Sequence, residues 1–219
     1  DNLFSQSLVC LDIRTGERVW HFQMVHHGIW DYDNPSPPIL VDVTVDGTAV
    51  KAVVQVTKQA FAYVFDRLTG DPIWPIEERP VPSSDIPGER TSPTQPFPSK
   101  PAPFDLQGLT VDDLIDFTPQ LRAEAIEIAS QYRTGPIFTP PSLEGAANGP
   151  KGLIQSPGQG GGSNWEGGAV DVESGVLYVA SVTRPIVRGL FNDREQSDMN
   201  FIDARWRLDG PQGLPLTKP

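Results

Sequence analysis

Residues 10–20, CLDIRTGERVW, and residues 64–74, VFDRLTGDPIW, are two copies of one pattern. Each copy has an apolar segment, an Asp-x-x-Thr-Gly sequence and a second segment that ends in tryptophan, at Trp20 and Trp74. The pattern predicts a β-hairpin, because Asp and Thr oxygens accept hydrogen bonds from turn amides and Gly supplies the positive φ that the turn requires. A unit that repeats at this spacing indicates stacked sheets, such as propeller blades. We therefore expect each tryptophan to be buried against a neighbouring unit.

Other stretches of the chain carry strand and turn signals of the same kind. Short runs of Asp, Ser and Gly between apolar segments predict tight hairpin turns. The pairs expected are 5–12 with 17–23, 61–66 with 72–74, 41–45 with 49–57 across Asp46-Gly47, and 169–171 with 176–181 across Glu173-Ser174-Gly175, with a further strand near 200–204. Together these segments predict an all-β chain.

Residues 75–135 break the strand pattern in two different ways. Prolines crowd residues 75–103, which predicts a long ordered loop or linker rather than a strand. Thr118-Pro119 then predicts a helix start, with Thr as the cap, and Gly135-Pro136 predicts the helix end. The apolar residues of this segment fall on one side of a helix, so we expect the helix to dock on the sheets. They are Leu121, Ala125, Ile128 and Tyr132.

The charge balance of the 219 residues is strongly acidic. Lys and Arg number 17 against 28 Asp and Glu, a net charge of −11. This balance argues against a nucleic acid or an anionic membrane surface as a partner, since both select basic patches. Cys10 is the only cysteine, so no disulfide can form within the chain.

The repeat resembles that of the pyrroloquinoline quinone (PQQ)-dependent alcohol and sugar dehydrogenases, and it is most similar to the glucose and quinate dehydrogenase branch. Further segments resemble signatures of that family and occur in the family's order along nearly the whole chain. They are 26–33 (HHGIWDYD), 57–61 (TKQAF), 93–97 (PTQPF), 137–142 (IFTPPS) and 162–165 (GSNW). The resemblance implies part of an eight-bladed quinoprotein β-propeller, about three blades with a short helical insertion. We expect residues 1–219 to form one partial propeller domain, internal to a longer protein, with residues 75–135 as its Pro-rich loop and helical insertion.

Asp31 and Lys58 are the residues that the resemblance marks for chemistry. The aspartate that follows this tryptophan is the family's general base, which takes the substrate hydroxyl proton. The basic residue at the place of Lys58 hydrogen-bonds the quinone oxygens. From the residues alone, the favoured interpretation is plainer: Asp31 and Asp33 are surface carboxylates on one face of an extended segment, and Lys58 is a solvated lysine. This chain has Ala60 where the family usually has glycine, which would strain a turn that needs positive φ.

Asn164 and Trp165 follow a glycine-rich run, 158–162. The run lacks the Lys-Ser/Thr ending and the helix start of a phosphate-binding loop, so we expect its glycines to let the backbone approach a flat ligand closely. The resemblance implies that Asn164 and Trp165 contact PQQ. The alternative for Trp165 is a repeat-type tryptophan docked between two blades.

His27 and a metal ion complete the expected site. His26 and His27 are adjacent, so in a strand they would point to opposite faces and could not chelate one metal together. The resemblance places His27 in the substrate pocket, although Gly28 stands where glucose dehydrogenases usually carry Asp. It also implies Ca²⁺ or Mg²⁺ between PQQ and the base, with Asp31 as one ligand and the other ligands outside this chain.

These expectations predict a periplasmic enzyme that oxidises a sugar, polyol or alcohol by hydride transfer to PQQ and passes electrons to ubiquinone or a cytochrome c. The alternative is a non-catalytic propeller scaffold that resembles an outer-membrane assembly factor. A pure scaffold needs neither the Trp-Asp segment nor the lysine. A glycosidase that uses Asp31 and Asp33 is a weaker alternative, because two residues on one strand face do not bracket a glycosidic bond.

Overall fold

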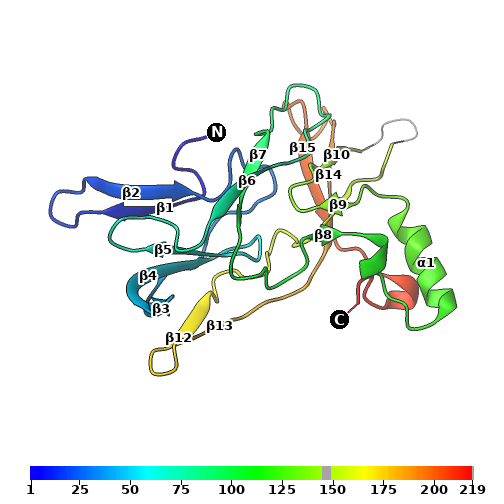
Figure 1. Cartoon of the computed structure of the whole chain (residues 1–219). Coiled ribbons are helices and arrows are strands. Elements are labelled where there is room, and N and C mark those ends of the chain that lie inside the picture. Colours follow the sequence, from blue (N-terminus) through cyan, green and yellow to red (C-terminus); the bar gives the residue numbers. More distant parts are fainter. Residues whose placement is uncertain (145–148, 219) are drawn as a thin grey trace. The chain divides into compact units, whose positions relative to one another are not determined.

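A computed structural model describes residues 1–144 and 149–218, and strands dominate these residues (Figure 1). The chain divides into two compact units. The first comprises Asp1–Val81, Thr91–Asp105 and Gly160–Val182, and the second comprises Pro82–Arg90, Leu106–Gln159 and Thr183–Pro219. The expected class, strands with one short helical insertion, is confirmed. Among the described residues, no helix has the length and apolar character needed to cross a membrane.

The first unit consists of antiparallel strand pairs and one three-stranded sheet. Its strands are β1 (Ser7–Leu11), β2 (Arg18–Gln23), β3 (Ile39–Val45), β4 (Thr48–Val56), β5 (Ala62–Asp66), β6 (Ile76–Pro80), β7 (Thr94–Pro98), β12 (Gly168–Asp171) and β13 (Val176–Val179). They pair as β1–β2, β3–β4–β5, β6–β7 and β12–β13. The hairpins expected across Asp46-Gly47 and across Glu173-Ser174-Gly175 are therefore confirmed.

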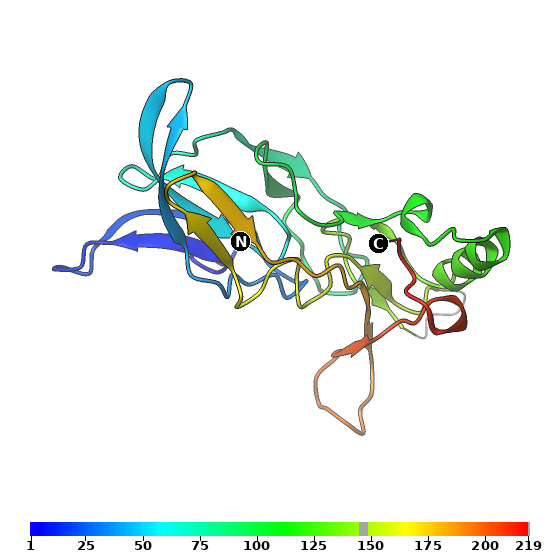
Figure 2. The ribbon, with the colours of Figure 1, turned by 90° about the horizontal axis from the view of Figure 1, so that it is seen from below.

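The β3–β4–β5 sheet is covered on both faces, which explains the nearly unbroken apolar runs of β4 and β5. On one face, Val54 and Val64 belong to a cluster that packs against β12–β13. On the other face, the Phe22 ring of β2 lies 6.0 Å from the Tyr63 ring and 5.0 Å from the Phe65 ring. Figures 1 and 2 show these hairpins on either side of the sheet. The layers build the stacked arrangement that the repeat predicts.

The turns of the two repeat copies have the same hydrogen bonds. In the first copy, Asp12 Oδ1 accepts from the Arg14 amide over 2.8 Å, and the Gly16 amide donates to Asp12 O over 2.7 Å. The second copy repeats both bonds at Asp66 and Gly70, over 2.7 and 2.8 Å. Both glycines have positive φ. The turn chemistry predicted from Asp, Thr and Gly is confirmed.

Trp20 docks on the turn of the following copy. Its indole Nε1 donates to Arg67 O over 3.2 Å, and its ring centroid lies 5.9 Å from that of Phe65. A Cβ added to Gly70 would lie 2.6 Å from the Trp20 ring, so the glycine also makes room for the indole. Trp20 thus packs against the next repeat as expected, but Trp20 and Trp74 are both only partly buried, so the full burial predicted for each tryptophan is not reached.

A third copy of the turn lies at residues 171–175 and was missed as a repeat. Asp171 Oδ1 accepts from the Glu173 amide over 3.0 Å, and the Gly175 amide donates to Asp171 O over 2.8 Å. Ser174 stands where the other copies have Thr and donates to Asp171 Oδ2 over 2.6 Å. No tryptophan ends this copy, which hid it from a search for the full pattern.

Two strand predictions in the first unit are wrong. Residues 72–74 form only an isolated bridge, Pro72 with Phe65, flanked by the Asp66 amide's bond to Asp71 O and the Ile73 amide's bond to Val64 O. Residues 75–103 contain the β6–β7 pair rather than only a loop. Their prolines pair at alternate positions where the main-chain groups face away from the partner strand, while the Val81 and Ser99 amides donate across the pair.

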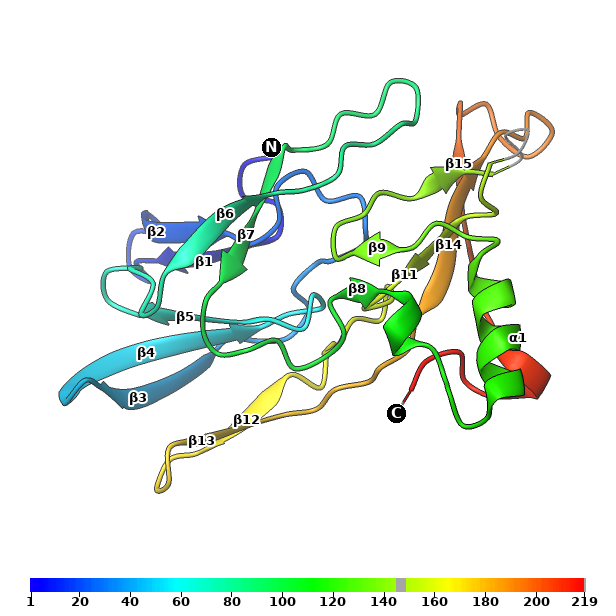
Figure 3. The ribbon, with the colours of Figure 1, turned by 45° about the vertical axis from the view of Figure 1, so that its right-hand side comes forward.

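The second unit holds the helix and a sheet built around one strand. Its elements are β8 (Gly108–Leu109), the 3-10 turn η1 (Val111–Asp113), α1 (Pro119–Ala129), β9 (Gly135–Pro136), β10 (Ser142–Leu143), β11 (Leu153–Gln155), β14 (Ile186–Phe191), β15 (Ile202–Trp206) and η2 (Pro211–Gly213). β14 pairs with β10, β11 and β15, and β8 pairs with β9. Figure 3 shows α1 beside η2.

The helix start is confirmed and its predicted end is wrong. The Leu121 amide donates to Thr118 Oγ1 over 3.1 Å, and α1 begins at Pro119. The helix ends at Ala129, and Gly135 and Pro136 belong to β9 instead. The expected apolar side of the helix packs into the core of the unit, which includes Leu109, Leu114, Ile115, Ile154, Val187 and Leu216.

Candidate functional site

Lys58 stands in a tight turn between β4 and β5. The Thr57 amide donates to Phe61 O, and the Ala60 amide donates to Thr57 O, both over 3.0 Å. Ala60 has a φ of +63°, so the position does require the conformation that glycine adopts most easily. The turn forms with alanine there, at a cost of about 1 to 2 kcal/mol in backbone strain.

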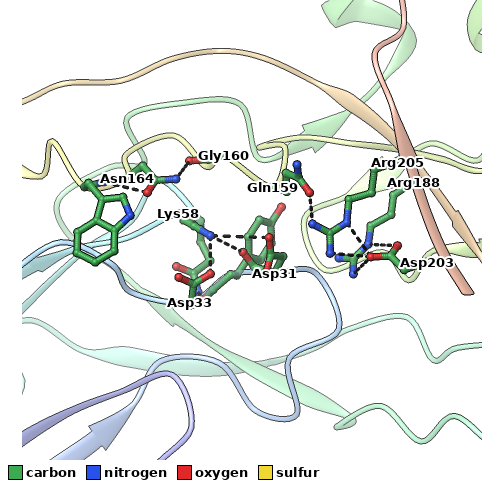
Figure 4. A network of polar contacts seen from close by, with 12 residues as sticks. Asp31, Asp33, Lys58, Gln159, Gly160, Asn164, Arg188, Asp203 and Arg205 are labelled. Carbon is green, nitrogen blue, oxygen red and sulfur yellow. Dashed lines mark hydrogen bonds and ion pairs between the residues drawn. The ribbon is translucent and has the colours of Figure 1, made fainter.

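The Lys58 ammonium lies between two aspartates, although the lysine side chain is only 8% exposed. Its Nζ donates to Asp31 O over 3.2 Å and to Asp33 Oδ1, and it lies 3.9 Å from Asp31 Oδ2. Figure 4 shows the ammonium directed at both residues. The structure therefore brings Asp31 and Lys58, predicted separately from two distant segments, to one place.

Buried aromatic rings fix the segment that carries the two carboxylates. Trp30 and Tyr32 are buried and their rings stack with centroids 6.4 Å apart. Asp31 has a φ of +64°, so the extended conformation assumed for residues 29–33 is wrong. The side chains of Asp31 and Asp33 are nevertheless both accessible, 40% and 53% exposed. Buried rings thus alternate along this segment with accessible carboxylates.

A second hydrogen bond joins the two segments, from the Gln59 side chain to the main chain of Tyr32. Gln59 Nε2 donates to Tyr32 O over 3.3 Å, next to the Lys58 contacts with Asp31 and Asp33. Sequence reasoning did not single out Gln59, because a glutamine in a turn carries no signal of its own.

The glycine-rich run lies directly against Lys58. The Gly162 amide donates to Lys58 O over 2.9 Å. Gly161 has a φ of +77°, and a Cβ there would lie 2.5 Å from the Cα and Cβ of Lys58. A Cβ at Gly162 would lie 2.6 Å from that of Ala60. These glycines therefore let the backbone pack closely on the lysine turn, and their expected approach to a flat ligand stays a prediction.

Asn164 and Trp165 follow this run but make no hydrogen bond with Lys58 or Asp31 in the described part of the chain. Asn164 Nδ2 donates to Gly160 O over 2.8 Å, and Asn164 Oδ1 accepts from the Trp165 amide over 2.9 Å (Figure 4). The amide keeps one hydrogen and one lone pair for a ligand. Trp165 is 78% exposed, so it is not docked between sheets in this structure.

The two histidines differ in their surroundings. The His26 ring lies 2.7 Å from Gln23 Oε1 and 3.0 Å from Glu78 Oε1, so both of its nitrogens have partners. His27 is partly buried with a φ of +46°, and the pair does not lie in a strand. No hydrogen bond joins the His27 ring to Asp31 or Lys58 among the described residues.

The site does not amount to a metal centre. Within residues 1–144 and 149–218, no group of three or more His, Cys, Asp and Glu side chains could hold an ion. Ca²⁺ takes six to eight oxygen ligands. Asp31 could supply one of them, and the described residues do not supply the rest.

A second polar cluster in the other unit was missed by sequence reasoning. Arg188 donates two hydrogen bonds to the Asp203 carboxylate, from Nε to Oδ1 over 2.9 Å and from Nη2 to Oδ2 over 3.1 Å. Arg205 Nε also donates to Asp203 Oδ2, over 2.7 Å. Burial raises the pKa of Asp203, but the two arginines outweigh burial and leave that pKa below its ordinary value. Arg205 also donates to Gln159 Oε1. The pairing of β14 with β15 brings these residues together, and their spacing along the chain gives no sign of it.

Comparison with known protein families identifies the class to which these strand pairs and this aspartate-lysine site belong. Residues 1–214 match the family described as PQQ: glucose/ethanol/alcohol dehydrogenase, beta-propeller domain. The chain belongs to this family. The fold class predicted from the repeat is thereby confirmed.

Named relatives cover nearly the whole chain. The glycerol dehydrogenase large subunit of Gluconobacter oxydans is 39% identical over 219 residues, which span 98% of this chain and 28% of that protein. The quinoprotein glucose dehydrogenase of the same organism is 40% identical over 85% of this chain and 22% of that protein. The quinate/shikimate dehydrogenase (quinone) of Acinetobacter baylyi is 35% identical over 82% and 21%. The chain thus spans about a quarter of the length of these relatives.

Solved structures agree in fold. A europium-containing methanol dehydrogenase superposes with a TM-score of 0.53 at 19% identity, over 96% of this chain and 29% of that one. At this identity the likeness supports the propeller fold alone.

Proposed function

We propose that this chain forms part of a PQQ-dependent dehydrogenase that oxidises the CH–OH group of a sugar, polyol or alcohol. One observation carries the proposal: a nearly buried ammonium, that of Lys58, lies 3.9 Å from the accessible carboxylate of Asp31. A base and a cation at this separation can serve one small substrate and its electron acceptor together. The relatives named above, which carry glycerol, glucose and quinate in their names, support this class of reaction.

The two residues would act at different atoms. Asp31 would accept the proton of the substrate hydroxyl at its carboxylate, the part of the site that remains accessible. Two of the three ammonium hydrogens of Lys58 have acceptors in Asp31 O and Asp33 Oδ1. Lys58 would donate its third hydrogen to an oxygen that gains negative charge in the reaction. When bound, PQQ would take the hydride from the substrate carbon.

The residues around Lys58 fit a flat, anionic cofactor. Trp165 presents an exposed ring, and the Asn164 amide retains one hydrogen for an acceptor atom. Close packing of Gly161 and Gly162 on the lysine turn keeps side chains of this run away from it. We propose that Asn164 and Trp165 hold the cofactor, with His27 on the substrate side.

Further parts of the proposal come from the resemblance and from the relatives. A Ca²⁺ or Mg²⁺ ion would use Asp31 as one ligand, and its remaining ligands would come from outside the described residues. We also propose a periplasmic location and ubiquinone or a cytochrome c as the electron acceptor. Measuring which acceptor restores turnover, with the enzyme in a periplasmic fraction, tests both.

The decisive experiment reconstitutes the full-length protein with PQQ and Ca²⁺ and follows reduction of a dye with a panel of sugars, polyols and alcohols. Asp31→Asn should lower turnover by about 100- to 10,000-fold, the usual contribution of a general base. Asp46→Asn is the matched control, because Asp46 is an exposed aspartate that also has positive φ, +49°. Asparagine adopts that conformation readily, so neither change should strain the backbone.

Two outcomes would reject the proposal. Turnover of Asp31→Asn close to that of Asp46→Asn would remove Asp31 from the chemistry. Failure of the unchanged protein to bind PQQ would favour the scaffold alternative, in which Lys58 and its two aspartates only hold two segments together.

A further inference from the structure

We propose that Gln95 is a positioning residue, which fixes the turn at His26 and His27 and so directs the His27 ring toward the substrate. The inference deepens the proposed function and rests on it, because it takes His27 to lie on the substrate side. It also gives a role to residues 93–97 (PTQPF), a segment that the proposed reaction does not otherwise use.

The Gln95 side chain binds the main chain of His26, 69 residues away. The His26 amide donates to Gln95 Oε1 over 2.8 Å, and Gln95 Nε2 donates to His26 O over 2.6 Å. Paired residues of antiparallel strands exchange the same two bonds. Because a main-chain N–H only donates and a carbonyl only accepts, the backbone fixes which way the glutamine amide points. Gln95 is fully buried, so water does not compete for either bond.

The two bonds hold the peptide planes on both sides of His26. The plane that contains His26 O also contains the nitrogen of His27, and φ of His27 is measured from that plane. This φ is +46°, in the left-handed region, where a residue other than glycine stays only if its surroundings hold it. Gln95 therefore helps to set the direction in which the His27 side chain leaves the backbone.

The strand that carries Gln95 is itself held in place. Tyr63 of β5 is buried, and its hydroxyl donates to Pro96 O of β7 over 2.8 Å. The Phe61 and Phe97 rings of the same two strands meet edge to face, with centroids 5.6 Å apart. Gln95 thus projects from a rigid support, which allows it to fix a turn that lies far from it in the sequence.

The two histidines then differ in what their rings can bind. Both ring nitrogens of His26 have partners within the chain. No hydrogen bond reaches the His27 ring from residues 1–144 or 149–218. A neutral imidazole has one donor and one acceptor, and a hydroxyl group can satisfy either of them. The His27 ring therefore suits a hydroxyl group of a sugar or polyol.

The kinetic experiment uses the full-length holoenzyme with PQQ and Ca²⁺ and measures kcat and KM by dye reduction. Gln95→Met keeps the length of the side chain and removes both bonds, and His27→Gly removes the ring but tolerates the positive φ. Each should lower kcat/KM by about three- to tenfold, mainly through KM, which is the value of one hydrogen bond to the substrate. The double variant should be no worse than His27→Gly, because Gln95 acts through the ring.

Two kinetic results would overturn the proposal. One is an unchanged KM in Gln95→Met or His27→Gly, and the other is additive losses in the double variant. Asp31→Asn tests the proposed function separately, so a loss of activity there with no effect at Gln95 rejects the positioning role alone.

Tyr63→Phe is the matched control, because it removes a buried hydrogen bond to the residue next to Gln95 without touching either histidine. It should lower the urea midpoint and leave KM unchanged. A rise of KM in Tyr63→Phe equal to that in Gln95→Met would show that any loosening of β7 has this effect, and would overturn the proposal.

Hydrogen exchange followed by mass spectrometry does not depend on activity. In a peptide that covers residues 24–31, Gln95→Met should speed the exchange of the most protected amide by about tenfold or more, because the His26 amide loses its acceptor. Tyr63→Phe should not. Unchanged exchange in Gln95→Met would overturn the proposal. Faster exchange in a protein whose unchanged form reduces no dye would instead reject the proposed function, and with it substrate binding by His27, while the hold of Gln95 on the turn stands.

Discussion

Docking of Trp20 on the next repeat predicts unequal effects of one substitution at two equivalent glycines. Gly16 and Gly70 occupy the same place in their turns, with φ of +74° and +81°. An added Cβ at Gly16 would meet no atom within 4 Å, whereas at Gly70 it would lie 2.6 Å from two ring atoms of Trp20. The two alanine variants therefore share the backbone strain and differ only in the contact with the indole.

The contact sets the expected difference in the free energy of unfolding. Alanine in the left-handed region costs about 1 to 2 kcal/mol, which is the whole cost expected for Gly16→Ala. Gly70→Ala adds about 1 to 3 kcal/mol for displacing the packed ring, and about 1 kcal/mol for the bond from Trp20 Nε1 to Arg67 O. We expect Gly70→Ala to be about 2 to 4 kcal/mol more destabilising than Gly16→Ala.

Urea denaturation followed by far-ultraviolet circular dichroism measures this difference, and equal m-values show that both variants unfold from similar states. Repeating the pair in a Trp20→Ala background isolates the indole, because the difference should then nearly disappear. Equal losses for Gly16→Ala and Gly70→Ala, or a difference that persists without the indole, would refute the docking argument.

Three further changes test other contacts. Asp203→Asn should lower the free energy of unfolding by about 3 kcal/mol at neutral pH, because it leaves the buried Arg188 without its partner. Since the folded state lowers the pKa of Asp203, this stabilisation exists above the ordinary Asp value and is lost as pH falls through the lowered one, so the two urea curves should converge in acid. Thr118→Ala removes the cap of α1 and should cost about 1 kcal/mol, seen as a lower thermal midpoint. Gly161→Ala should cost about 2 kcal/mol or more in urea and reduce turnover, because its Cβ would overlap Lys58.

Each of these changes has a control in the same chain. Asp209→Asn breaks an exposed pair with Arg207 and should cost less than about 1 kcal/mol. Thr118→Ser keeps the capping oxygen. Gly160→Ala places its Cβ in open space and should leave stability almost unchanged. If a control variant lost as much stability as its test variant, the contact named for that test variant would not be the cause of the loss.

The repeat could be predicted from the sequence because its signal is local. Asp12, Gly16 and their equivalents interact within five residues, so a short stretch of sequence contains every residue that forms the turn. The third copy escaped notice because Ser174 replaces Thr and no tryptophan follows, although Ser serves the same turn. A search for Asp-x-x-Ser/Thr-Gly alone would have found all three.

Prolines misled the prediction for residues 75–103. A proline breaks a ladder only where its amide would face the partner strand, and in β6–β7 the prolines fall at positions that face away. Which positions face away depends on the register between the strands. That register joins residues about 20 apart, and composition alone does not reveal it.

In the candidate site, too, the local signatures could be predicted from the sequence and the contacts between distant segments could not. Residues 26–33 and 57–61 each carry a local signature, but neither shows that the Lys58 ammonium contacts both Asp31 and Asp33. The positive φ of Asp31 is likewise not visible in its local sequence. A left-handed aspartate is conformationally costly unless its surroundings hold it, and here the buried rings on either side do so. The strained conformation of Asp31 is therefore held by the packing of Trp30 and Tyr32, a tertiary effect that the local signature does not show.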